Sequence, residues 1–160
     1  MKIIIVGCGR TGAFLAGVLA DADHDVTIID LERAAFAHLP QDFKGTTLLG
    51  NGTDLDVMRT AGVDKADALF TLTQGDNRNL MGAQIAKQIF GVKQVIAKVN
   101  DPIRANTYRE HGIITVSRTS IMGTLFEALL MGDPEVGKVL LEKSKAREAR
   151  MADAWLGDAR

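Results

Sequence analysis

Short apolar segments alternate with longer amphipathic segments along most of the chain. The apolar segments are rich in β-branched residues, and several are apolar at consecutive positions, as in strands buried on both faces of a parallel sheet. The longer segments repeat apolar residues at helical spacing and often end at glycine or proline. The predicted strands are 3–6, 26–29, 46–49, 68–72, 95–99 and 113–116, and the predicted helices are 11–20, 32–39, 54–61, 77–90, 102–111 and 117–131.

Six strands with helices between them indicate a series of βαβ units. Right-handed crossovers arrange such a series as a doubly wound sheet. The sequence therefore predicts an α/β protein with a Rossmann-like, mainly parallel six-stranded sheet. Within the helix 77–90, we expect Leu80, Ile85 and Ile89 to face the core. The nucleotide-binding domain is predicted to span 1–133, and the polar remainder, 134–160, to be a helical or solvated tail, partly disordered.

Composition excludes several classes of protein. Of the 160 residues, 46% are hydrophobic and 24% are charged, so the chain can bury a core. The 19 basic and 20 acidic residues give a net charge of -1, which argues against a nucleic-acid partner. Cys8 is the single cysteine, which is typical of a reducing compartment. No apolar run reaches the roughly 18 residues of a membrane span, so we expect a soluble, cytoplasmic protein.

A glycine-rich segment joins the first predicted strand to the first predicted helix. Gly7, Gly9 and Gly12 have the spacing G-x-G-x-x-G: the first permits a tight turn, the second lets the backbone approach a phosphate, and the third permits close packing of helix on strand. Asp30 ends the second predicted strand, where a carboxylate accepts hydrogen bonds from ribose hydroxyls. These residues predict a site for an adenine nucleotide, or for NAD rather than NADP; the alternative is a βα turn without a ligand.

Other residues near this loop have more than one interpretation. Arg10 reaches the phosphates of a bound ligand, or of one bound to a neighbouring subunit, or it faces solvent. Cys8 fits as a small packing residue, although its place near a helix N-terminus predicts a lowered pKa and a redox role. Arg33 is close enough to Asp30 to influence the choice between NAD and NADP, or it lies on a solvated helix face.

Polar residues also follow the third, fourth and fifth predicted strands, at the edge where a doubly wound fold binds its ligand. Asn51 and Thr53 contact an adenine edge, or Thr53 or Asp54 caps the next helix. The hydroxyls near Thr73 contact ribose or phosphate, or they begin a turn. Lys98 contacts the ligand or forms a salt bridge. The candidate ligand-binding residues are Gly7, Cys8, Gly9, Arg10, Thr11, Gly12, Asp30, Leu31, Arg33, Asn51, Gly52, Thr53, Thr71, Leu72, Thr73 and Lys98.

Several kinds of chemistry have no matching pattern. The three histidines are far apart and none has a metal-ligand spacing, so we predict no metal site. A hydride-transfer enzyme needs a domain that holds its substrate against the nicotinamide, and the predicted sheet uses nearly the whole apolar part of the chain. We therefore predict no catalytic residues.

The last predicted helix is apolar nearly all round from Ile121 to Met131. A helix of this kind must be covered on more than one side, which a small sheet cannot do alone. A symmetric dimer would cover it, and the alternative is that the polar tail folds back over it.

These segments together resemble the RCK domain, the regulator of K+ conductance, of the TrkA N-terminal type, over 1–133. The segments that carry the resemblance are Gly7 to Gly12, Ile28 to Asp30, Gly50 to Asp54, Ala66 to Thr73, Asp76 to Leu80 and Ala97 to Pro102. The resemblance implies a cytoplasmic regulatory subunit that senses NAD(H), AMP, ADP or ATP and acts on a membrane K+ channel or K+ transporter. It also implies a homodimer or a larger even assembly, up to an octamer.

The resemblance implies roles for particular residues. It assigns Gly7, Gly9, Arg10, Thr11 and Gly12 to the phosphate loop, Asp30 to the ribose, Asn51, Gly52 and Thr53 to the adenine side, Thr73 to the loop near the ribose and phosphate, and 120–131 to a crossover helix at a dimer interface. Some members carry an acid before that helix that helps a cation bridge to the phosphates. Residues 117–120 hold none, which again predicts no metal.

The predicted function is therefore a non-catalytic nucleotide sensor whose ligand changes the arrangement of a dimer. A small NAD-dependent oxidoreductase, or a fragment of one, is the alternative that the same glycine segment allows. A methyltransferase is a third interpretation, since such loops also bind S-adenosylmethionine.

Overall fold

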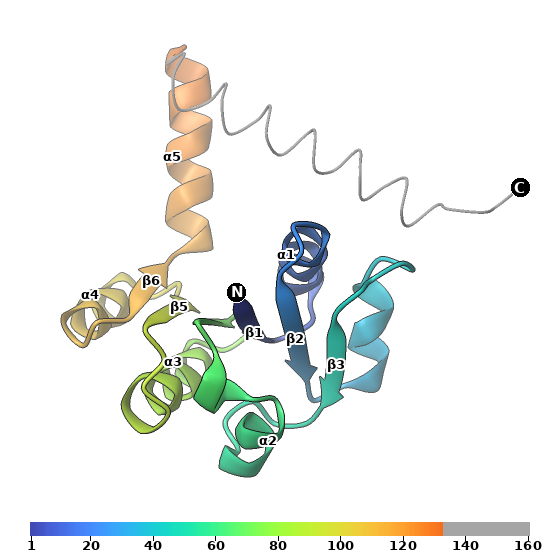
Figure 1. Ribbon diagram of the computed structural model, residues 1–160. Coiled ribbons are helices and arrows are strands. Elements are labelled where there is room, and N and C mark those ends of the chain that lie inside the picture. The colour runs from blue at the N-terminus through green and yellow to red at the C-terminus, as the bar shows by residue number, and fades with distance from the viewer. Residues whose placement is uncertain (133–160) are drawn as a thin grey trace, which may run out of the picture.

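The computed structural model describes residues 1–132 (Figure 1). The tail predicted for 134–160, and its suggested packing on the last helix, lie outside these residues. The strands are β1 (Lys2–Val6), β2 (Asp25–Asp30), β3 (Thr46–Leu49), β4 (Ala68–Thr71), β5 (Gln94–Lys98) and β6 (Ile114–Val116). The α-helices are α1 (Arg10–Asp21), α2 (Leu55–Thr60), α3 (Asp76–Gln84), α4 (Pro102–Glu110) and α5 (Arg118–Met131), and the shorter helices are η1 (Arg33–His38), η2 (Val63–Lys65) and η3 (Ile85–Ile89).

The six strands form one parallel sheet in the order β3-β2-β1-β4-β5-β6. After β3 the chain returns to the centre of the sheet and places β4 beside β1. The strand order therefore reverses at the carboxyl ends of β1 and β4, which is where open α/β sheets bind their ligands. This topology confirms the predicted Rossmann-like fold.

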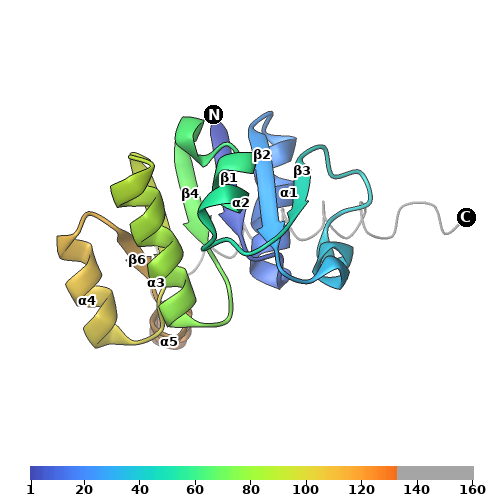
Figure 2. The ribbon, with the colours of Figure 1, turned by 90° about the horizontal axis from the view of Figure 1, so that it is seen from below.

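Two hydrophobic clusters lie on opposite faces of the sheet. Ile4 belongs to a cluster that contains Met58 of α2 and Leu80 of α3, and all three are almost fully buried. Ile5, the next residue of β1, belongs to the other cluster with Ala16 of α1, because successive side chains of a strand point to opposite faces. Figure 2 shows the same division, with α2 and α3 on the near side of the sheet and α1 behind it.

The helix predicted over 77–90 contains a change of period. It is α-helical only to Gln84 and continues as the π-helical turn η3, in which the Phe90 amide donates to the Ile85 carbonyl oxygen at 3.2 Å. The wider turn rotates the following residues about the helix axis. Ile89 is 59% exposed, whereas Phe90 packs against the core. The prediction that Ile89 faces inward was therefore wrong, because it assumed a uniform period.

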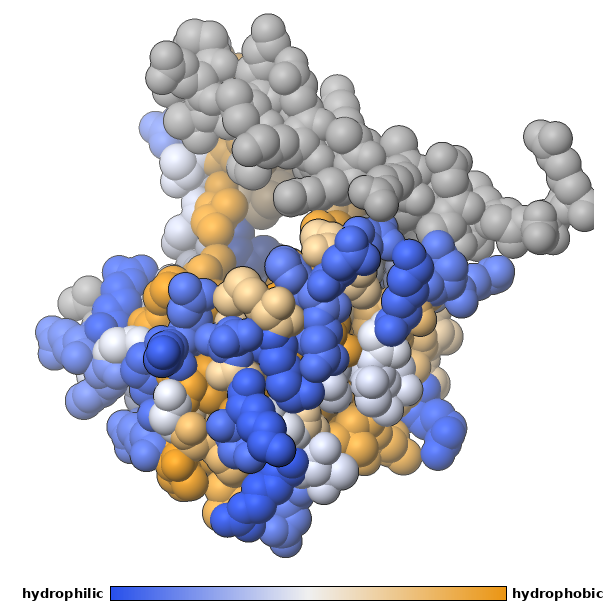
Figure 3. Space-filling model, viewed as in Figure 1, coloured by the Kyte–Doolittle hydropathy of each residue, from blue (hydrophilic) through white to orange (hydrophobic). Residues whose placement is uncertain are grey.

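Helix α5 extends away from the sheet (Figure 1). It has no buried residue, and its exposed apolar side chains include Phe126, Leu130 and Met131. Figure 3 shows apolar side chains along the visible part of this helix. Ile114 of the edge strand β6 is also exposed. Within residues 1–132, no helix has both the length and the apolar character needed to cross a bilayer.

The core position of Met58 gives a stability prediction. Met58→Ala should lower the free energy of unfolding by about 2–5 kcal/mol, because it leaves a cavity in a fully buried site. Met81→Ala is the matched control, since Met81 is 53% exposed on α3, and its effect should stay within about 0.5 kcal/mol. Urea unfolding measures both variants, and equal effects would contradict the assignment of Met58 to the core.

Candidate functional site

The glycine segment forms a tight turn between β1 and α1. Gly7 has a φ of +107°, which L side chains rarely adopt, and a Cβ at Gly12 would lie 1.9 Å from the Gly7 carbonyl oxygen. Side chains at these two positions would break the turn. A Cβ at Gly9, in contrast, would meet no atom within 4 Å, and no side chain caps the first turn of α1. The N-terminus of α1 therefore presents backbone N–H groups to open space, as phosphate-binding loops do.

Asp30 connects the end of β2 to this turn. Its Oδ2 accepts the Cys8 amide at 2.6 Å, and its Oδ1 accepts the Glu32 amide at 2.9 Å. Each carboxylate oxygen has a second acceptor position. Asp30 can therefore hold the turn and also accept hydrogen bonds from the two hydroxyls of a ribose.

Cys8 is fully buried beneath the turn. Burial, and secondly the charge of Asp30, raise the pKa of the Cys8 thiol from 9.0 to about 12. The lowered pKa predicted from the helix N-terminus was wrong, because desolvation and a neighbouring carboxylate outweigh that effect. Cys8 is a packing residue whose amide, rather than its thiol, takes part in the site.

The loop after β3 has its own internal hydrogen bonds. Asn51 Oδ1 accepts from the amide of Thr53 at 3.1 Å and from its hydroxyl at 2.9 Å. The N-cap of α2 is Asp54, which accepts the amides of Asp56 and Val57. Of the alternatives open from sequence, Asp54 rather than Thr53 caps the helix. Within residues 1–132, the side-chain amide nitrogen of Asn51 has no partner, so it is available to a ligand.

Asn79 fixes the loop after β4. This fully buried side chain accepts from the amide and the hydroxyl of Thr73, at 2.8 and 2.7 Å, and donates to the carbonyl oxygens of Thr73 and Lys98. Such a satisfied buried network makes the loop rigid. Sequence reasoning did not select Asn79 as a site residue, although a polar residue at an inward helical position beside Leu80 was a usable signal.

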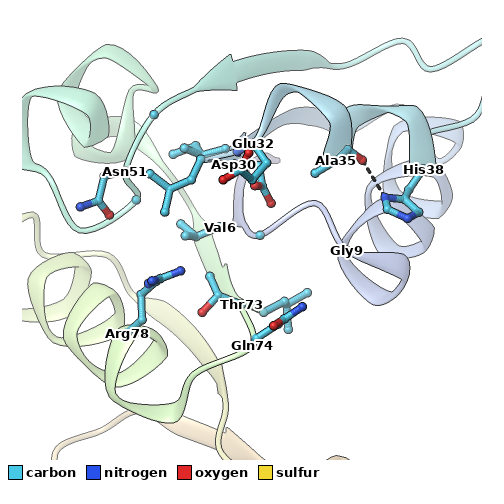
Figure 4. Close-up of a pocket in the computed structure, with 16 residues that line it drawn as sticks. Val6, Gly9, Asp30, Glu32, Ala35, His38, Asn51, Thr73, Gln74 and Arg78 are labelled. Carbon is cyan, nitrogen blue, oxygen red and sulfur yellow. Dashed lines mark hydrogen bonds between the residues drawn. The ribbon is translucent and has the colours of Figure 1, made fainter.

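These loops surround a cavity of about 420 Å³ at the carboxyl edge of the sheet (Figure 4). Half of the predicted ligand residues line it, and they come from the turns after β1, β2, β3 and β4. These residues are Gly7, Gly9, Asp30, Leu31, Asn51, Gly52, Leu72 and Thr73.

Five predicted residues of the first turns do not line this cavity. Cys8 and Gly12 are buried within the turn, where they support its shape. The side chains of Arg10, Thr11 and Arg33 are exposed outside the cavity. These three side chains therefore do not form part of the cavity wall, and their contacts with a ligand stay predictions.

Three further predicted residues also lie outside the cavity wall. Thr53 turns its hydroxyl toward Asn51, and Thr71 is buried within β4. Lys98 ends β5, one strand beyond the cavity, where burial and then the charge of Arg118 lower its pKa, against an opposing effect of Asp76. Strand ends share one edge of the sheet, but they do not all reach the same cavity.

Sequence reasoning missed several polar residues of the cavity wall. Glu32 lies beside Asp30, and His38 lies further along η1, where its Nδ1 is 2.8 Å from the Ala35 carbonyl oxygen (Figure 4). Gln74 and Arg78 line the wall from the β4–α3 region. Glu32 and Gln74 could have been found from their places just after strands. The positions of His38 and Arg78 in the cavity wall depend on how their helices are oriented, which the sequence does not reveal.

The cavity fits a nucleotide in three respects. The open space at Gly9 and the uncapped first turn of α1 suit a phosphate group. The free acceptor positions of Asp30 suit ribose hydroxyls, and the apolar side chains of Leu31 and Leu72 suit a flat base.

The raised pKa of Cys8 predicts its reactivity. In the folded protein the thiol should stay protonated and unlabelled by a thiol reagent at pH 8, whereas the urea-unfolded chain should react at once. Unfolding also releases the thiol proton between pH 9.0 and about 12, so stability should fall across that range. Rapid labelling of the folded protein would contradict the buried, protonated state.

The sequence is similar to a protein family and to a curated relative. The TrkA-N domain family model matches residues 3–119. The Trk system potassium uptake protein TrkA of Streptomyces coelicolor is 41% identical over 117 residues, which are 73% of this chain and 52% of that protein. The chain thus spans about half the length of this curated relative.

Solved structures share the fold at lower identity. The Kef CTD of Shewanella denitrificans in its AMP-bound form matches with a TM-score of 0.66 and 19% identity, over 97% of this chain and all of that one. GsuK matches in its NAD-bound channel form, with a TM-score of 0.61 and 20% identity over 72% of this chain and 21% of that one. The ADP-bound form of GsuK matches with a TM-score of 0.69 and 22% identity, over 82% of this chain and 34% of that one. Because the TrkA-N family model matches most of its length, the chain belongs to the TrkA-N domain family.

Proposed function

We propose that this chain is a non-catalytic cytoplasmic regulator that binds an adenine nucleotide, or NAD(H), and controls a membrane K+ channel or K+ transporter. The observation that carries the proposal is that one cavity contains both the open turn at Gly9 and the carboxylate of Asp30, which keeps free acceptor positions. The names of the relatives support the transport role, and the AMP, NAD and ADP of the solved structures support the ligand class.

Each part of the ligand has a counterpart in the cavity. The backbone N–H groups at the start of α1 would bind the phosphate, and Asp30 would accept the ribose hydroxyls. The amide nitrogen of Asn51 would donate to an acceptor on the base, because its oxygen is already occupied by Thr53. A free 2′-hydroxyl suits Asp30, which favours NAD over NADP.

A second copy of the chain would cover the apolar surface of α5. Phe126, Leu130 and Met131 are 61%, 82% and 75% exposed, and Ile114 adds apolar surface on the edge strand. Such exposure is costly in water and is typical of an interface. The ligand would regulate transport by binding more tightly to one arrangement of the dimer than to another.

Replacing Asp30 tests the nucleotide site. Asp30→Asn keeps one acceptor for the turn but loses the negative charge, so nucleotide affinity should fall about 5- to 150-fold. Isothermal titration of NADH, NAD, AMP, ADP and ATP measures this, with Asp64→Asn on η2 as the matched control. Absence of saturable binding of every one of these ligands to the wild-type chain would sink the proposal.

The same variant tests the transport role in cells. Rubidium uptake should differ between cells that carry the natural chain and cells that carry Asp30→Asn in its place. Identical uptake, despite lost binding in vitro, would separate nucleotide binding from K+ transport.

The dimer proposal is tested on α5. Phe126→Glu should convert a dimeric or larger species into a monomer, because a charge would be buried in the apolar interface. Native mass spectrometry and sedimentation measure the change. Leu55→Glu on α2 is the control and should leave the assembly unchanged. A wild-type chain that is monomeric at high concentration would refute the proposed interface.

A further inference from the structure

Arg78 belongs to the first turns of α3, which the structure holds firmly in place. Asp76 Oδ2 accepts the amides of Asn100 and Asp101, each at 2.9 Å. Asn79, the residue after Arg78, bonds to Thr73 and to the Lys98 carbonyl oxygen. The backbone that carries Arg78 is therefore anchored to two neighbouring loops at the edge of the sheet.

The packing of α3 directs Arg78 toward one end of the cavity. A Cβ at Gly82 would lie 3.4 Å from the Gly52 carbonyl oxygen and 3.9 Å from Thr53 Cγ2, so this face of α3 rests on the loop after β3. Arg78 lies four residues before Gly82 on the same face, and helical side chains tilt toward the N-terminus. Its side chain consequently extends past this loop. Figure 4 shows it reaching into the cavity on the side of Asn51, away from His38.

The guanidinium of Arg78 is available to a ligand. Within residues 1–132 no hydrogen bond or ion pair holds it, although it lines a cavity whose other wall carries Asp30 and Glu32. A guanidinium can interact with a nucleotide in two favourable ways: it pairs with phosphate oxygens, or its plane stacks on the aromatic ring of the base.

The position of Arg78 distinguishes these two uses. The phosphate position is at Gly9, where α1 approaches from one face of the sheet. Arg78 comes from α3, on the opposite face, beside the loop of Asn51 that would meet the base. Leu31, which is 45% exposed, lines the same cavity from the turn after β2 and offers an apolar surface to a flat ring.

We propose that Arg78 is a specificity-determining residue that stacks its guanidinium plane on the base of the bound nucleotide, with Leu31 as apolar surface for that base. This inference rests on the proposed nucleotide-binding function. The stacking favours a purine, whose larger ring system offers more π surface, and it makes the contribution of Arg78 independent of the number of phosphates.

The test compares ligands that share a base and differ in phosphate number. Adenosine, AMP, ADP and ATP are titrated into the wild-type chain, Arg78→Gln, Arg78→Lys and the control Arg59→Gln, which alters an exposed arginine on α2. Arg78→Gln should weaken all four ligands by the same factor, about 2- to 30-fold, at both low and high salt. Arg78→Lys should not restore affinity, because its ammonium is not planar, and Arg59→Gln should change nothing.

Two results would overturn the stacking role. A loss that grows from AMP to ATP, fades at high salt and is restored by Arg78→Lys would assign Arg78 to the phosphates. Unchanged affinity of Arg78→Gln, with normal wild-type binding, would remove Arg78 from the site and leave the proposed function intact. If the wild-type chain binds none of the ligands, the nucleotide site and the stacking role both fail.

Discussion

The close approach of α1 to the end of β1 determines the geometry of the whole carboxyl edge. It is possible only because Gly12 has no side chain, since a Cβ there would lie 1.9 Å from the Gly7 carbonyl oxygen. The approach brings the first turn of α1 to the edge and leaves open space at Gly9. Asp30 then stabilises the turn through the Cys8 amide while retaining acceptor positions of its own.

The sequence was most informative where a local constraint fixes the structure. Consecutive apolar residues in β1 and the spacing of Gly7, Gly9 and Gly12 require few long-range assumptions, so the fold and the tight glycine turn between β1 and α1 were predicted correctly. The π-helical turn at η3 was not predicted, because its residues have ordinary helical character and only packing shows which side chain faces inward.

The unpredicted parts of the site depend on tertiary structure in the same way. The pKa of Cys8 follows from burial and from Asp30, which lies more than twenty residues away along the chain. The place of Arg78 in the cavity follows from the contact of α3 with the loop of Gly52. Lys98 shows the opposite case: it ends a neighbouring strand at the same edge of the sheet, but it does not line the cavity, which stops before β5.

The protected thiol of Cys8 has a consequence for the protein under oxidising conditions. Peroxides attack the thiolate, and a buried thiol with a pKa of about 12 supplies almost none at physiological pH. Oxidation to a sulfinic acid would place a second negative charge against Asp30 and beneath the N-terminus of α1. By keeping Cys8 reduced, the fold preserves the positive electrostatic potential at the N-terminus of α1 when the surrounding redox conditions change.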